Sequence, residues 1–188
     1  LNGPSLTNCV FENNEATFQG GGINARRTAA LIQDCLFRDN TSPGVAGVAG
    51  SGNGGGVWMQ GDAPLFGGTP RVLRSSFSDN FAGSYGGGLS LQDTAARVER
   101  CTFARNRADS RGGGIRISGG QPRVVACTFD ENRGGYYGGG LSMESSGGAN
   151  LLVWNCAFRR NVASGGGALK ISMAEATVGN SLFVANGP

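Results

Sequence analysis

Apolar residues recur along this chain in units of about 26 residues. The motif Phe-x-x-Asn occurs seven times, and an aliphatic residue stands five positions before each Phe. Between successive copies come two or three glycines and then an aliphatic residue, as in Gly112-Gly113-Gly114-Ile115. Self-similarity at such a period is the signature of a repeat architecture. The Phe residues of the motif are Phe11, Phe37, Phe77, Phe103, Phe129, Phe158 and Phe183.

Within each unit, apolar and polar residues alternate with the period of a β-strand. Ile115-Arg116-Ile117 and Cys101-Thr102-Phe103 both place apolar side chains at every second position. Glycine triplets disfavour a helix by about 1 kcal/mol per residue relative to alanine. Strands this short bury a face only when each unit stacks on a similar one. The pattern therefore predicts an all-β fold, a single-stranded right-handed parallel β-helix (solenoid) of about seven rungs.

Stacking places equivalent residues in columns about 4.8 Å apart, which is the spacing between strands. We expect Phe103, Phe129 and Phe158 to be buried and stacked on adjacent rungs. The Asn of each motif should lie at a turn, because Asn tolerates positive φ and its side chain can bond its own backbone or the next rung. The glycines should lie at a corner that requires positive φ or a close backbone approach.

Five cysteines share one column with Ser75 and Ser181. Parallel side-chain directions keep neighbouring Cβ atoms near the rung spacing rather than the ~3.8 Å of a disulfide. We therefore expect unbridged thiols that serve as small hydrophobic groups, with Cys101, Cys127 and Cys156 adjacent and buried. The five are Cys9, Cys35, Cys101, Cys127 and Cys156.

The amino-acid composition argues against several classes of function. The 188 residues include 35 glycines and no histidine, so imidazole-based triads and imidazole metal ligands are excluded. A net charge of +3 gives no strong case for nucleic acid. No apolar run approaches the ~20 residues of a membrane-spanning helix, so we expect no membrane insertion by this segment. No cofactor and no metal are expected.

The copy Phe158-Arg159-Arg160-Asn161, followed by Gly166-Gly167-Ala168-Leu169, resembles the repeats of the chlamydial polymorphic outer membrane proteins. The resemblance covers the chain from Leu6 to Asn186 and implies an extracellular or cell-surface β-helix that adheres to something. It implies no enzyme activity and no fixed ligand residues. Residues 1–188 are interpreted as one segment of a longer solenoid, with neighbouring domains of a parent chain at both ends.

Three functional hypotheses follow. The first is a non-enzymatic structural or adhesive segment that presents loops to a protein or glycan partner. The second is a carbohydrate-acting domain of the polysaccharide lyase or hydrolase kind, and the third is a rung array within an assembled extracellular filament. Asn40-Thr41-Ser42 forms a glycosylation sequon, but its Asn belongs to the repeated motif.

One unit is interrupted. Loop insertions at about residues 41–53 and 60–71 flank the short strand that contains Trp58. Alternation directs Trp58 outward, and insertions at turns tend to carry function. The predicted partner contact therefore consists of Trp58, Asp62, Leu65 and Phe66. The alternative is that Leu65 or Phe66 folds back and covers the indole.

Two outward columns carry charge. The column two after Phe alternates in sign from Asp79 onward, which favours cross-rung ion pairs, and Asp39 above Asp79 is a weak hint of calcium. A second column contains Tyr85, Arg111 and Tyr137, in which the cation can stack between the rings. Stabilisation of the rod is the favoured interpretation of both.

Overall fold

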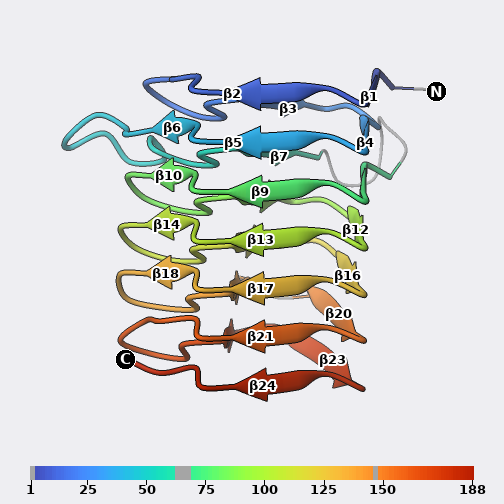
Figure 1. The fold of residues 1–188 in the computed structure, drawn as a ribbon, viewed down its shortest axis with the longest axis vertical. Coiled ribbons are helices and arrows are strands. Elements are labelled where there is room, and N and C mark those ends of the chain that lie inside the picture. The colour runs from blue at the N-terminus through green and yellow to red at the C-terminus, as the bar shows by residue number, and fades with distance from the viewer. Residues whose placement is uncertain (1–2, 62–68, 146–147) are drawn as a thin grey trace.

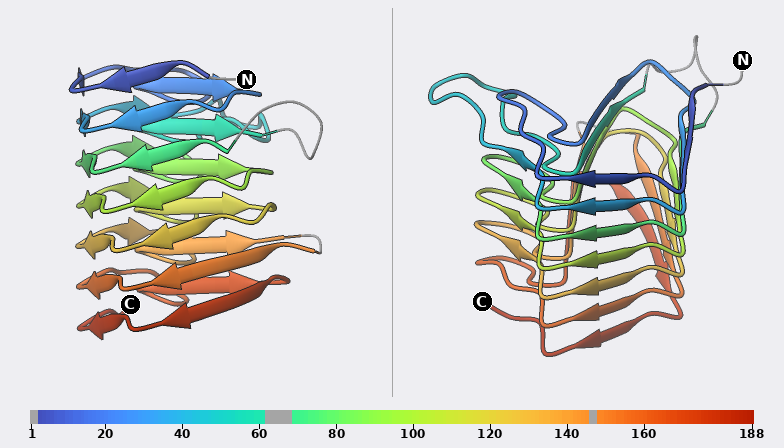
Figure 2. Two further views of the ribbon diagram at one scale, coloured as in Figure 1. Left: turned by 90° about the vertical axis from the view of Figure 1, so that its right-hand side faces the viewer. Right: turned by 45° about the horizontal axis from the view of Figure 1, so that its top comes forward.

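The computed structural model describes residues 3–61, 69–145 and 148–188. In these residues every regular element is a strand, and no helix is present (Figure 1). The strands pair in parallel into four sheets and stack as the rungs of a β-solenoid. Figure 2 shows successive rungs stacked along one axis, with the insertion after β6 extending from the side. The predicted parallel β-helix is confirmed.

Two sheets have seven strands each. The first, called here the valine sheet, comprises β1 (Ser5–Thr7), β4 (Leu31–Gln33), β8 (Arg71–Leu73), β12 (Arg97–Glu99), β16 (Arg123–Val125), β20 (Asn150–Trp154) and β23 (Glu175–Gly179). The second, the phenylalanine sheet, comprises β2 (Val10–Glu12), β5 (Leu36–Arg38), β9 (Ser76–Ser78), β13 (Thr102–Ala104), β17 (Thr128–Asp130), β21 (Ala157–Arg159) and β24 (Leu182–Val184).

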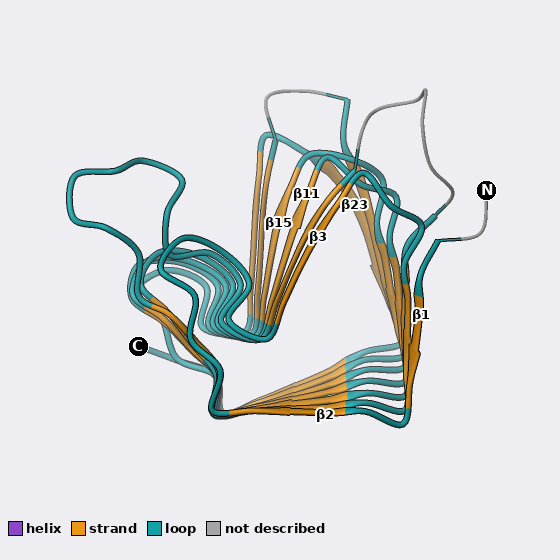
Figure 3. Ribbon diagram, turned by 90° about the horizontal axis from the view of Figure 1, so that it is seen from above, coloured by secondary structure: helices purple, strands orange, loops and turns teal. Residues whose placement is uncertain are grey.

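The other two sheets complete each rung. The corner sheet has the two-residue strands β6 (Thr41–Ser42), β10 (Phe81–Ala82), β14 (Arg107–Ala108) and β18 (Arg133–Gly134). The glycine-led sheet has β3 (Ile23–Arg26), β7 (Val57–Gln60), β11 (Leu89–Gln92), β15 (Ile115–Ser118), β19 (Leu141–Glu144) and β22 (Leu169–Ser172). Figure 3 shows the chain passing from the valine sheet to the phenylalanine sheet, around the corner and into the glycine-led sheet.

The phenylalanine column fills the interior as predicted. All seven rings stack in sequence, with neighbouring centroids 4.5–5.1 Å apart. Phe103, Phe129 and Phe158 are fully buried. Each inner ring thus contacts a ring above and a ring below, and the stack ties every rung to its neighbours.

The asparagines form a second interior column, held by side-chain hydrogen bonds. Asn106 Nδ2 donates to the carbonyl of Phe77 (2.9 Å) and to Oδ1 of Asn132 (3.0 Å). Asn106 Oδ1 accepts from the backbone N–H of Asn80 (3.1 Å) and from Asn80 Nδ2 (2.9 Å). The predicted bond to the next rung is confirmed. Asn40 takes part in the same network and is fully buried, so the sequon is closed to modification in the fold.

The expected positive φ at these asparagines is wrong. The left-handed residue is the one before each Asn, such as Arg105 with φ of 53° and Glu131 with φ of 56°. A second left-handed position follows the valine sheet, for example Arg100 and Ala126. The Asn side chain therefore has the bonding role, while its neighbour makes the sharp turn.

The cysteines are free, as predicted. Cys101, Cys127 and Cys156 are buried in the core cluster, and the Cys101 backbone N–H lies 3.5 Å from the Cys127 sulfur. Burial raises the pKa of the Cys127 thiol well above its usual range. The Cys127 thiol therefore stays neutral, and the three side chains fill a small apolar position of the core.

Candidate functional site

Trp58 lies on the outer face of the glycine-led sheet, as the alternation predicted. Its strand neighbours in register are Asn24 and Ser90, while Val57 and Met59 belong to the core cluster. However, the Trp58 side chain is only 2% exposed. The prediction of an exposed tryptophan is therefore wrong, and the alternative of a covered indole holds, although Leu65 and Phe66 lie outside the described residues.

In this outer column Trp58, Ser90 and Ser142 are buried, while Asn24 is exposed and Arg116 and Lys170 are half-buried. A Cβ at Gly86 would lie 2.8 Å from the Cβ of Ser90, and a Cβ at Gly138 would lie 2.8 Å from that of Ser142. Both glycines have positive φ. The first glycine of the triplet thus lets the corner approach the next strand from outside. We call the crevice between corner and strand the outer notch.

Two columns line the outer notch. The corner column contains Asn53, Tyr85, Arg111 and Tyr137, joined by parallel bridges. The strand column contains Trp58, Ser90, Arg116, Ser142 and Lys170. In two rungs a large residue of one column shares its rung with a smaller residue of the other, as Trp58 does with Asn53 and Tyr85 with Ser90, whereas Arg111 and Arg116 are both large. These pairs lie five residues apart in the sequence, and the small Asn53 before Trp58 is a signal that sequence reasoning did not use.

The rest of the predicted contact lies outside the described residues. Asp62, Leu65 and Phe66 fall within 62–68, which the structure does not describe. In the described part, the Arg26 guanidinium lies 6.0 Å from the Trp58 ring. The indole Nε1 is buried without a hydrogen-bond partner among the described residues. Trp58 consequently serves the packing of its rung, and the described residues offer no exposed indole at this site.

Arg111 stacks between two tyrosines, as predicted. Its guanidinium lies 5.8 Å from the Tyr85 ring and 5.4 Å from the Tyr137 ring, and it forms an ion pair with Glu144. Arg116 lies 4.8 Å from the Tyr85 ring. Burial lowers the pKa of the Arg116 guanidinium, because a charged group loses water in the notch. These contacts hold the corner against the strand.

A hollow of about 200 Å³ opens at the lower end of the notch. Arg111 and Glu144, which form an ion pair, both line it, and Lys170 lies 5.4 Å from the Tyr137 ring. The pair satisfies both charges internally, which makes the hollow a poor site for a charged ligand. Its lining residues are Arg111, Tyr137, Ser142, Met143, Glu144, Lys170 and Ser172.

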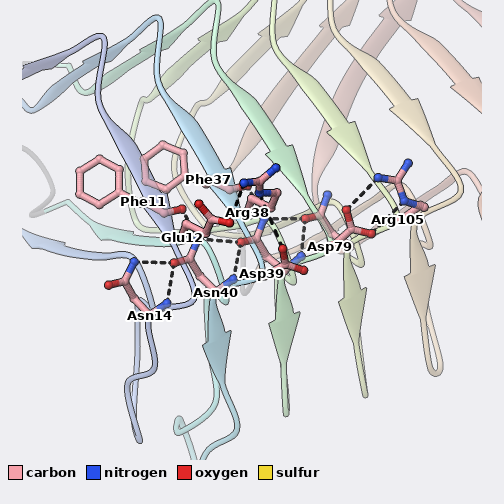
Figure 4. Close-up of polar contacts among 11 residues, drawn as sticks. Phe11, Glu12, Asn14, Phe37, Arg38, Asp39, Asn40, Asp79 and Arg105 are labelled. Atoms are coloured by element: carbon pink, nitrogen blue, oxygen red, sulfur yellow. Dashed lines mark hydrogen bonds and ion pairs between the residues drawn. The ribbon is translucent and has the colours of Figure 1, made fainter.

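The acidic column beside the phenylalanine sheet is paired with arginine (Figure 4). Asp79 accepts from Nε and the terminal nitrogen of Arg105, both at 2.8 Å, and Asp39 lies 3.8 Å from Arg38. Arg160 binds Glu131, the cross-rung pair predicted from alternating signs. Both oxygens of Asp79 are therefore occupied. Among the described residues no group of three or more His, Cys, Asp or Glu side chains could hold a metal ion.

The described residues contain no helix that is long and apolar enough to cross a membrane. Comparison with curated proteins and with solved structures gives no match for this chain. The family model for the right-handed β-helix region matches residues 2–183. The stacked parallel sheets, the phenylalanine column and this match agree, and the chain belongs to the right-handed β-helix family.

Proposed function

We propose that this chain is a non-enzymatic extracellular or cell-surface β-helix segment, which acts as a rigid support and adheres through its outer faces. The observation that carries the proposal is the contrast between inside and outside. The inner columns use the same residue types in every rung, while the outer columns change from rung to rung. A rod of constant interior and variable exterior suits the display of contact surfaces.

The resemblance to the chlamydial polymorphic outer membrane protein repeats supports the same role. The Phe and Asn of those motifs build the inner columns, so the resemblance concerns the scaffold rather than a ligand site. In this proposal, the exterior that differs from rung to rung selects the partner, which is a protein or a glycan. A continuing parent chain would join the two end rungs to neighbouring domains.

A carbohydrate-acting enzyme is the competing function, because the family includes structural and carbohydrate-active members. Lyases and hydrolases on this fold need acidic side chains free to act on the substrate. Here Asp34, Asp79, Asp130 and Glu131 each bind an arginine. Glu99 and Asp93 form no ion pair with a described residue, but they belong to no acidic group of three or more that could hold a metal ion. The paired acids favour the structural and adhesive role.

The test measures both adhesion and catalytic turnover of polysaccharides with the same chain. Beads coated with the chain are passed over surfaces that carry glycans or matrix proteins, with albumin-coated beads as the control. The same chain is incubated with soluble polysaccharides, and new reducing ends and unsaturated products are measured. The proposal expects retention on at least one surface without cleavage. Cleavage that is lost in Asp79→Asn would show an enzyme instead.

A further inference from the structure

Three arginines form an in-register column on the outer face of the valine sheet. Arg97 of β12 pairs with Arg71 of β8 on one side and with Arg123 of β16 on the other. All three side chains are exposed. We call Arg71, Arg97 and Arg123 the arginine ladder, and its rungs repeat at about 4.8 Å.

No arginine of the ladder forms an ion pair within the described protein. Six other arginines form ion pairs with acidic side chains, namely Arg38, Arg74, Arg105, Arg107, Arg111 and Arg160. The ladder arginines form no such pair and no side-chain hydrogen bond with any described residue. Like charges at this spacing repel each other even in water. An anionic ligand along the column would relieve that repulsion.

Two more charged residues, Glu99 and Arg100, lie beside the ladder. Glu99 shares the outer face of β12 with Arg97, and no ion pair joins the two. Arg100 at the following corner adds an exposed positive charge. The face is therefore positive overall, but only moderately so.

An exposed tryptophan lies on the same face. Trp154 of β20 is 42% exposed, and its register neighbours are Val125 and Gly179. A Cβ at position 179 would come within 1.9 Å of Trp154 Cζ3, so the indole lies directly over Gly179. Only glycine leaves room for the ring there. This indole is one rung from Arg123, which pairs with Leu152 of the same strand.

A shallow hollow lies beside the last arginine. It has a volume of about 300 Å³ and is lined by Gln121, Pro122, Arg123, Asn150, Leu152 and Thr177. Arg123 supplies a cation to it, and Gln121 and Asn150 supply amide groups that both donate and accept hydrogen bonds. Such a mixture suits hydroxyl-bearing ligands. The valine sheet runs along the right-hand side of the view in Figure 3, between the labels β23 and β1.

From these observations we infer that the outer face of the valine sheet binds a linear anionic polysaccharide along the solenoid axis. Carboxylate or sulfate groups pair with the arginine ladder, and a sugar ring lies against Trp154. An extended sugar chain can present one anionic group per rung, because a sugar unit is about as long as the rung spacing. The inference rests on the proposed adhesive function and names its ligand class.

A nucleic acid is the less suitable polyanion. Its affinity comes from many phosphate contacts, and duplex DNA carries one charge per ~1.7 Å of axis. The three ladder arginines, with Glu99 beside them, match a ligand that carries fewer charges per unit length than duplex DNA. The net charge of +3 leaves little additional attraction.

The test uses two triple variants with equal loss of charge. R71Q/R97Q/R123Q removes the ladder, and R38Q/R105Q/R160Q removes three arginines that lie beside the phenylalanine sheet. Binding is measured by calorimetry to polygalacturonate as the carboxylate probe, dextran sulfate as the sulfate probe and dextran as the neutral control. DNA of single and double strands is measured alongside. Circular dichroism and the unfolding midpoint verify that each variant is folded.

We expect binding to one or both charged polysaccharides and none to dextran. The ladder variant should lose about tenfold or more in affinity, and the control variant should stay within about threefold. Trp154→Ala should weaken binding while leaving the salt dependence nearly unchanged. The carboxylate and sulfate arms identify the anionic group.

Three results would overturn the inference: no binding to either charged polysaccharide, equal losses in both triple variants, or tighter binding to DNA than to both polysaccharides. If the chain instead cleaves a polysaccharide, the non-enzymatic function fails, while the dependence on the ladder remains a separate result. If the beads adhere to a protein surface but no polyanion binds, the function stands and the inference fails.

Discussion

Inner and outer columns of the same rung obey different rules. Asn106 is fully buried and its side chain makes four hydrogen bonds to adjacent rungs, while Arg105, its neighbour in sequence, is exposed and binds only Asp79. Every rung repeats the asparagine, and the position before it holds Asn, Asp, Arg, Glu or Ala. The difference indicates that stability depends on the inner columns and that the outer ones are free to vary.

The largest effect is expected from the inner aromatic column. Phe129→Ala should lower the free energy of unfolding by about 3–5 kcal/mol, because it removes a buried ring from the middle of the stack. Phe183→Ala is the matched control, since Phe183 is 44% exposed and has one ring neighbour in the stack. Denaturant unfolding measures both. A loss at Phe183 as large as at Phe129 would contradict the role assigned to the stack.

The outer notch provides the next test, because Trp58 lies on the outer face of its sheet and is nevertheless buried. Trp58→Ala should cost about 2–4 kcal/mol of stability, as expected for a large buried side chain. Trp58→Phe should cost less, because the indole N–H has no partner to lose among the described residues. If Trp58→Ala left the unfolding midpoint unchanged and abolished adhesion, the original prediction of a contact residue would return.

A smaller effect on the free energy of unfolding, of opposite sign, is expected at the turn between the valine sheet and the phenylalanine sheet. Ala126 has φ of 55°, a region that is costly for a residue with a Cβ. Ala126→Gly should therefore raise the stability by about 0.5–1 kcal/mol, after the greater freedom of glycine in the unfolded chain is counted. Asn155→Gly is the control at the equivalent corner and should gain less, because Asn tolerates this conformation. Thermal unfolding of the two variants measures which substitution raises the stability more.

The smallest effect concerns pH. Hydrogen bonds from Arg74 hold the pKa of Asp34 below its usual value. A lowered pKa means that Asp34 adds stability above its unfolded pKa of about 3.9, and that this contribution is lost as the pH falls through the folded pKa. Asp34→Asn should thus flatten the acid limb of the stability curve slightly, and the stability that it removes should be the same at neutral and at basic pH. A steeper acid limb in the variant would contradict the assignment.

The sequence predicted the interior well because each inner column repeats in register. The stacked Phe residues, the free thiols and the glycine corner follow from spacing and side-chain size alone. Burial of Trp58 was predicted only as an alternative, by Leu65 or Phe66, because alternation along a strand does not describe how the corner folds over it. The left-handed position was misplaced by one residue, since Arg105 and Glu131 are not residues that usually mark positive φ. The arginine ladder was missed because a column of like charge appears only once the strands are in register.

The most direct test of the division between inside and outside compares two adjacent residues in one experiment. Urea unfolding is measured for Asn106→Ala and for Arg105→Ala. The first should lose about 3 kcal/mol, because it leaves buried donors and acceptors of Asn80, Asn132 and Phe77 with fewer partners. The second should lose less than about 1 kcal/mol, the usual range for an exposed ion pair. Equal losses, or a greater loss at Arg105, would contradict the claim that the inner columns hold the solenoid together.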